Sequence, residues 1–196
     1  MNTYAPSSRA RTTAILLVLA ALATGCGAST NPYEATGPED TARAAARLEN
    51  LPSLEKSEAA GRRSVEELGA YITGLVPDLR WEWVDERRQS GCHRPYDQTR
   101  GKRVKLPNYV AAGSIPERVR ADVVQRAREL GAEFGADEGH AFQDEPGSLD
   151  IRFSGDAGTS LTLIDAGNTV ITANTGCRLP QAAFDPGTPN PPTPTP

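Results

Sequence analysis

The stretch GHAFQDEPGSLDIRFSGDAGTSLTLIDAGNTVITA, residues 139–173, decides the fold. It contains four short strand-like runs, at Gly139–Gln143, Leu149–Phe153, Ser160–Ile164 and Thr169–Ala173. The segments EPGS, GDAGT and DAGN separate these runs, and their Gly, Pro, Asn and Asp residues favour tight turns. The pattern therefore predicts a meander of antiparallel hairpins.

A helix is predicted directly before this meander. Ser114 and Glu117 form a potential capping box, and Pro116 lies in the first turn. One face is apolar and carries Val119, Val123, Ala127, Leu130 and Phe134. Gly135 is suited to end the helix.

Two further helices are predicted nearer the N-terminus. The run PEDTARAAARLEN, from Pro38, is rich in strong helix formers. Ser53 can cap a second helix that runs to about Val76. Gly61 is a candidate break within it, and Ser64 with Glu67 offers a second capping box; the apolar stripe of its later half consists of Val65, Leu68, Ile72, Leu75 and Val76.

Strands are predicted between these helices and the third one. Leu79, Trp81 and Trp83 alternate with other residues, as in a strand with one buried face. We expect the tryptophans to lie in the core, with an exposed ledge for a glycan or lipid chain as the alternative. Residues 85–99 are polar and turn-rich. A second short strand over Lys102–Val110 is interrupted at Pro107, which places it at a sheet edge or makes it irregular.

The order of elements defines the expected fold class. Helices come first, then one or two strands, a helix and a run of strands. This order predicts an α+β two-layer sandwich, with the helices packed on one face of a mainly antiparallel sheet.

The N-terminus has the layout of a secretory leader. Residues 1–25 combine Arg9 and Arg11, an apolar run too short to span a bilayer, and small residues before Cys26. This layout resembles a bacterial lipobox, although Ala23 stands where leucine is favoured. The resemblance implies cleavage after Gly25 and a lipid anchor on Cys26; the alternative is a secreted protein with a free thiol.

The predicted domain organisation follows from this leader. Residues 26–37 would be the lipidated cysteine and a flexible linker, and 38–183 a single globular domain. The proline-rich residues 184–196 would be a disordered tail, because they cannot bury apolar surface.

Two cysteines remain if Cys26 is acylated. Cys92 and Cys177 would then pair in a compartment where disulfides persist. The bond would close a loop of about 86 residues, for which chain entropy gives an upper limit of about 4 to 5 kcal/mol. A redox or catalytic thiol is the alternative, but a C-x-x-C motif is absent.

Charge is unevenly distributed along the chain. The net charge is −4, and loss of Arg9 and Arg11 with the leader makes it −6. Residues 80–105 carry eight Lys or Arg against four acids. We predict a binding patch for anionic lipid, a wall polymer or an envelope protein at Arg87, Arg88, Arg94, Arg100, Lys102, Arg103 and Lys105. The alternative is a solvated loop, and the acidic chain argues against nucleic-acid binding.

No familiar catalytic, cofactor or metal motif occurs in the sequence. His93 and His140 lack ligand-like spacing, so we expect no metal and no cofactor. An alternative function is a hydrolase or transferase that acts on an envelope polymer. Its carboxylate site would lie near Asp137, Glu138, Asp144 or Glu145.

Seven short stretches are informative when taken together: NPYEAT (31–36), DLRWEWV (78–84), SGC (90–92), LPNYV (106–110), FQDEPG (142–147), DIRF (150–153) and TGCRLP (175–180). Their combination resembles the mycobacterial LppA-type lipoproteins, and the similarity runs from the lipobox to Pro180. The resemblance implies an envelope lipoprotein with Cys26 lipidated and Cys92 bridged to Cys177. It supplies no activity.

The sequence therefore predicts a lipoprotein anchored to the cell membrane on its extracytoplasmic face. Its domain is expected to be a non-catalytic binding or interaction module. A lipid carrier with an internal apolar cavity is a further alternative.

Overall fold

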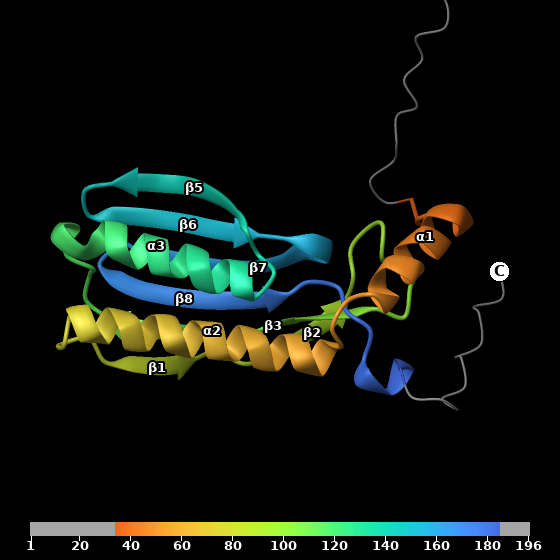
Figure 1. Cartoon of the computed structure of the whole chain (residues 1–196), viewed down its shortest axis with the longest axis horizontal. Coiled ribbons are helices and arrows are strands. Elements are labelled where there is room, and N and C mark those ends of the chain that lie inside the picture. The colour runs from red at the N-terminus through yellow and green to blue at the C-terminus, as the bar shows by residue number, and fades with distance from the viewer. Residues whose placement is uncertain (1–33, 185–196) are drawn as a thin grey trace, which may run out of the picture. The chain divides into compact units, whose positions relative to one another are not determined.

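Eight strands form one antiparallel sheet in the computed structural model, which describes residues 34–184 (Figure 1). The strand order is β1-β4-β8-β7-β6-β5, and β3 joins the β2–β3 hairpin to β8. The strands are β1 (Trp81–Val84), β2 (Arg88–Gly91), β3 (Lys102–Lys105), β4 (Asn108–Ala112), β5 (Glu138–Glu145), β6 (Ser148–Ser154), β7 (Thr159–Asp165) and β8 (Asn168–Thr175). Together with three α-helices, this sheet confirms the α+β fold class.

The predicted meander is present as β5-β6-β7-β8. Each strand pairs antiparallel with the next, and the β5–β6 register shifts at a bulge between Ala141 and Gln143. Gly147 and Gly167 have φ values of 79° and 86° in the turns. Such positive φ values favour glycine, which explains why the turn sequences predicted the hairpins.

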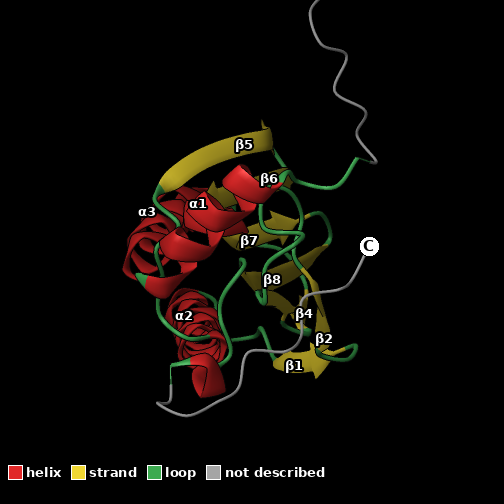
Figure 2. Ribbon diagram, turned by 90° about the vertical axis from the view of Figure 1, so that its right-hand side faces the viewer, coloured by secondary structure: helices red, strands yellow, loops and turns green. Residues whose placement is uncertain are grey.

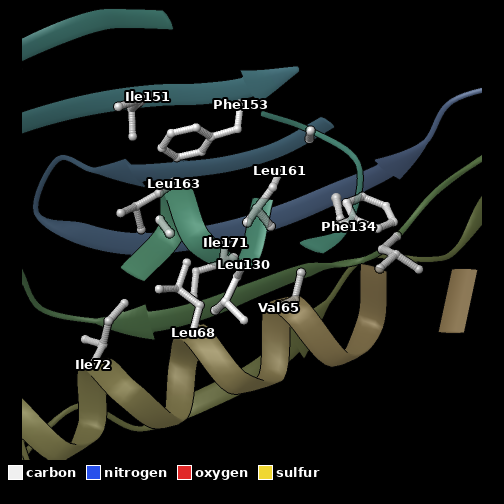
Figure 3. Packing of buried hydrophobic residues seen from close by; sticks show 14 of the residues in the cluster. Val65, Leu68, Ile72, Leu130, Phe134, Ile151, Phe153, Leu161, Leu163 and Ile171 are labelled. Atoms are coloured by element: carbon white, nitrogen blue, oxygen red, sulfur yellow. The ribbon is translucent and has the colours of Figure 1, made fainter. Parts of the chain in front are cut away.

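Two of the helices, α2 (Leu54–Leu75) and α3 (Glu117–Glu133), cover one face of the sheet (Figures 1 and 2). Figure 3 shows their apolar side chains meeting those of the strands. The fully buried members of this main core include Val65, Leu68, Ile72, Leu130, Phe153, Leu161, Leu163 and Ile171. The alternation of apolar residues in β6 directs Leu149, Ile151 and Phe153 into this layer.

The third helix, α1 (Pro38–Glu49), packs on a separate smaller cluster. The buried residues of this cluster, which we call the disulfide cluster, are Ala44, Leu48, Tyr96, Cys177 and Leu179. Thr36, just before α1, is hydrogen-bonded to the loop that contributes Tyr96 to this cluster. The Thr36 backbone N–H donates to Asp97 Oδ2 at 3.2 Å, and the Thr36 hydroxyl donates to the same carboxylate.

The predicted N-cap of α2 is confirmed, but the two signals predicted inside this helix are not. Ser53 caps it, because its hydroxyl accepts a hydrogen bond from Lys56 N at 3.3 Å. The suggested break at Gly61 is wrong, since α2 is continuous. A Cβ at Gly61 would lie 2.9 Å from Phe134 Cζ, so the glycine makes room for the ring. Ser64 is mid-helix and donates to Ala60 O rather than capping.

The predicted capping box of α3 is also wrong. The N-cap is Pro116, and no side chain caps the helix. The residues before α3 contact the sheet instead. Gly113 forms an isolated β-bridge with Asn168, and Ile115 N donates a hydrogen bond of 3.0 Å to the buried carboxylate of Asp165. This contact draws the chain away from the geometry that a capping Ser114 requires.

The region around the β2–β3 hairpin departs most from the prediction. Residues 85–99 contain β2, a strand that the polar sequence RQSG does not signal. The break at Pro107 is correct, because it separates β3 from β4. However, β4 lies between β1 and β8, so Pro107 marks an irregularity and not a sheet edge.

Figure 2 shows that the second face of the sheet carries no helix in the described part of the chain. Strand register places Val110, Val170 and Ile164 side by side on this helix-free face, each half-buried. The next row is polar and includes Thr172, Thr162 and Arg152. None of the described helices is both long enough and apolar enough to span a bilayer.

Candidate functional site

The predicted disulfide between Cys92 and Cys177 is present, with a Cα–Cα distance of 5.6 Å. It joins the segment after β2 to the segment after β8. Gly101 lies against both sulfur atoms, and a Cβ at this position would collide with them. Cys26, the other predicted site residue, lies outside the described residues, as do the leader and residues 185–196.

The seven basic residues of the predicted patch do not share one surface. Arg87 lies against α2, where its Nη2 donates to Glu58 Oε2 at 2.8 Å. This hydrogen bond raises the pKa of the Arg87 guanidinium. Arg94 lines a small pocket of about 200 Å³ beside the disulfide. Arg100 is exposed in the loop before β3, and Lys102 alternates to the opposite face of its strand from Arg103.

Three of the seven do gather, on one side of the β2–β3 hairpin. Arg88 lies directly opposite Lys105, and Arg103 lies opposite Ser90, to which it donates a hydrogen bond of 2.9 Å. Val104, between the two basic residues of β3, is buried in the main core. Alternation therefore places Arg88, Arg103 and Lys105 on the helix-free side, and we call them the hairpin cations.

The hairpin cations have no carboxylate partner within 4.0 Å among residues 34–184. Like charges directly opposite each other in an antiparallel pair are destabilising. The surface thus concentrates uncompensated positive charge. The row continues from Lys105 through Asn174 and Ser160, so hydrogen-bonding groups adjoin the charge.

The two acidic pairs proposed for an enzyme do not converge. Glu138 and Asp144 lie near opposite ends of β5, six residues apart, which corresponds to about 20 Å along a strand. Asp144 also forms an ion pair of 3.3 Å with Arg120. Within the described residues, no group of three or more His, Cys, Asp or Glu is arranged to hold a metal ion.

Trp81 and Trp83 face the helices, as expected for core residues. Trp81 stacks on Tyr109 with ring centroids 5.1 Å apart, and its Nε1 donates to Thr73. Arg62 of α2 lies over Trp83, 4.5 Å from the ring centroid. Both tryptophans are half-buried and pack against the main core.

A larger pocket, of about 930 Å³, was not expected from the sequence. It lies between the start of α2, the end of α3 and the loop Gly155–Ala157. Its lining includes Arg178, which is only 4% exposed. The sequence feature that pointed to Arg178 was its position directly after Cys177.

Arg178 is held by uncharged groups. Its guanidinium donates to Ser57 Oγ at 3.1 Å, to Cys177 O at 2.7 Å and to Thr159 Oγ1 at 2.6 Å. Burial lowers the pKa of Arg178, while the electrostatic effect of the Asp156 carboxylate acts in the opposite direction. An arginine remains charged under such conditions, so the pocket contains a desolvated cation.

These features define a class of protein: a disulfide-closed α+β domain with one helix-covered and one helix-free sheet face. The chain belongs to the LppA family, described as a lipoprotein confined to pathogenic Mycobacterium, whose sequence profile matches residues 29–181. The resemblance seen in the sequence is thereby confirmed.

One solved structure shows the same fold. The crystal structure of LppA from Mycobacterium tuberculosis has a TM-score of 0.59 and 16% identity, covering 76% of this chain and 92% of that one. A DUF4853 family protein from Actinomyces odontolyticus is also 16% identical, over 72% of this chain and 74% of its own, with a TM-score of 0.45. No curated protein sequence matches the chain.

Proposed function

We propose that this protein is anchored through acylated Cys26 to the extracytoplasmic face of the cell membrane, and that its domain is a non-catalytic module that binds anionic lipid headgroups. The lipoprotein family and the leader support the anchor. The disulfide supports an oxidising compartment outside the cytoplasm.

The observation that carries the binding role is the set of hairpin cations. Arg88, Arg103 and Lys105 share one exposed side of a hairpin and lack carboxylate partners in the described range. Phosphate groups at an anionic membrane surface would relieve the repulsion between Arg88 and Lys105. Each basic residue near such a surface contributes about 1 kcal/mol, so three correspond to roughly a hundredfold in affinity.

The tether is compatible with this contact. Thr36 is the tenth residue after Cys26, and an extended chain spans at most about 3.6 Å per residue. An acylated Cys26 would therefore hold Thr36 within about 36 Å of the membrane. Thr36 is bonded to Asp97, in the loop that connects β2 with β3, so the tether enters the domain beside the hairpin.

Vesicle sedimentation of the mature chain carrying Cys26→Ser tests the proposal. At low salt, we expect vesicles rich in phosphatidylglycerol to retain it and neutral phosphatidylcholine vesicles not to. The triple variant R88Q/R103Q/K105Q should bind about a hundredfold more weakly. Added salt should weaken wild-type binding, because it screens surface charges.

A matched control removes three charges elsewhere. R43Q/R63Q/R118Q changes three exposed helix residues and has the same net charge as the hairpin variant. If both triple variants lose equal affinity, the effect is general electrostatics and the hairpin site is wrong. Binding to a soluble anionic polysaccharide but not to anionic vesicles would indicate that the ligand is a wall polymer and not a lipid surface.

A further inference from the structure

The pocket at Arg178 is separate from the hairpin cations. It lies on the helix side of the molecule, with Ser57 of α2 and Phe134 at the end of α3 in its lining. Its volume of about 930 Å³ is within the range of sites that hold small molecules. Its properties therefore require their own explanation.

The buried cation has capacity for a ligand. A guanidinium carries five N–H donors, and the hydrogen bonds to Ser57, Cys177 and Thr159 use one each. No carboxylate of residues 34–184 lies within 4.0 Å of Arg178. Asp156 is the acid that most affects it, but this carboxylate is paired with Arg47 of α1. A buried charge without an ionic partner is costly, and a bound anion would offset that cost.

The rim limits which anion can bind. The pocket is also lined by the exposed acids Glu133, Asp137 and Glu138, and by Lys56. Like charges repel, so these carboxylates disfavour a dianion such as phosphate. They favour a ligand that combines one negative group with a positive one.

We propose that this pocket binds a small zwitterionic carboxylate, such as an amino acid or the end of a short peptide. The ligand carboxylate would accept hydrogen bonds from the free N–H donors of Arg178. Its ammonium group would lie against Glu133 and Asp137 at the rim. The apolar surface of Phe134, Pro52 and Ala60 would contact the carbon chain between the two groups.

The test titrates the mature Cys26→Ser protein with a series of ω-amino acids, from glycine to 6-aminohexanoate. Hexanoate, hexylamine and inorganic phosphate serve as comparison probes. We expect at least one member of the series to bind ten times more tightly than any comparison probe. Amide chemical shifts should change at Ser57, Gly135 and Ala157, which line the pocket.

Two variants distinguish the two halves of the site. Arg178→Gln should abolish binding of both the amino acid and hexanoate. Because Arg178 is also a structural hydrogen-bond donor, E133Q/D137N provides a variant with changes only at exposed positions. It should weaken amino-acid binding about tenfold and should not weaken hexanoate binding, because it removes charges that repel the hexanoate carboxylate.

The matched control is D122N/E145Q, which neutralises two exposed acids outside the pocket lining. It should bind every probe as the wild type does. The inference is overturned if no ω-amino acid binds, if phosphate binds better, or if E133Q/D137N and the control behave alike. Failure of this test leaves the vesicle result intact, because none of these residues is a hairpin cation.

Discussion

The main core and the disulfide cluster are stabilised by different means. The main core joins α2 and α3 to β3, β4, β6, β7 and β8 and consists of buried aliphatic and aromatic side chains. The disulfide cluster has five buried residues and joins α1 to two loop segments. The Cys92–Cys177 bond, the Thr36–Asp97 contact and the Arg47–Asp156 ion pair hold those segments together. The comparison indicates that the sheet layer is maintained by packing, whereas the end that contains α1 and Thr36 depends on covalent and polar links.

The largest effect is expected from truncation in the main core. Phe153 is fully buried, and its ring lies against Gly131 and Gly139. Phe153→Ala should lower the free energy of unfolding by about 3 to 5 kcal/mol through lost burial and a residual cavity. Chemical denaturation measures this change.

Leu179→Ala in the disulfide cluster serves as the comparison. This cluster is smaller and can collapse around the missing group. We therefore expect the free energy of unfolding to fall by about 2 kcal/mol, near the lower end of the range for Leu→Ala substitutions. Equal losses for the two substitutions would contradict the distinction between the two regions.

Removal of the disulfide sharpens the same distinction. The double variant C92A/C177A should lose about 2 to 4 kcal/mol of stability, because the bond restricts a loop in the unfolded chain whose ends are 85 positions apart. Hydrogen exchange should accelerate first in α1 and residues 93–101. Amides of β6 to β8 should remain the slowest to exchange.

A uniform loss of protection across the sheet would show that the two regions unfold as one unit. Reduction of the wild-type disulfide under native conditions provides an independent measurement, since it introduces no substitution. Both perturbations should give the same exchange pattern.

Packing between α2 and the sheet is tested with two glycines of the same helix. A Cβ at Gly69 would lie 2.7 Å from Tyr109 Cε1, whereas a Cβ at Gly74 meets nothing within 4 Å. Gly69→Ala should destabilise the protein by about 1 to 3 kcal/mol, because it overpacks the core. Gly74→Ala should stabilise it by up to about 1 kcal/mol, because alanine favours helix.

Thermal unfolding of both variants checks the pair. If Gly69→Ala also stabilises the protein, then the aromatic cluster of Trp81, Trp83 and Tyr109 moves aside at little cost. The close contact between α2 and β4 would then be less restrictive than the structure indicates.

The meander could be predicted because its signals are local. Turn residues and alternation lie within the strands that they define. In contrast, β2 has no apolar residue, and it is a strand only because β3 pairs with it. The start of α3 was misplaced because Asp165, 50 residues away, holds Ile115.

The candidate sites also divide into those with a local sequence signal and those that depend on contacts between distant residues. The disulfide followed from the count of cysteines, and the basic segment was visible as composition. Which of its members gather could not be predicted, since this depends on strand alternation in the unrecognised hairpin. The Arg178 pocket depends on contacts such as the one with Ser57, 121 residues away, which no local pattern encodes.

The smallest effect concerns the contact between Thr36 and Asp97 beside the disulfide cluster. Hydrogen bonding from Thr36 lowers the pKa of Asp97 to about 2. The contribution of this carboxylate is therefore complete above its unfolded value of about 3.9 and is lost as the pH falls from there through about 2. At neutral pH, Asp97→Asn should speed hydrogen exchange at the start of α1 and leave the sheet unaffected. Asp78→Asn, at an exposed acid, is the control. An Asp97 pKa near 3.9 in an NMR titration, with unchanged exchange in α1, would mean that Thr36 does not hold this end of the domain.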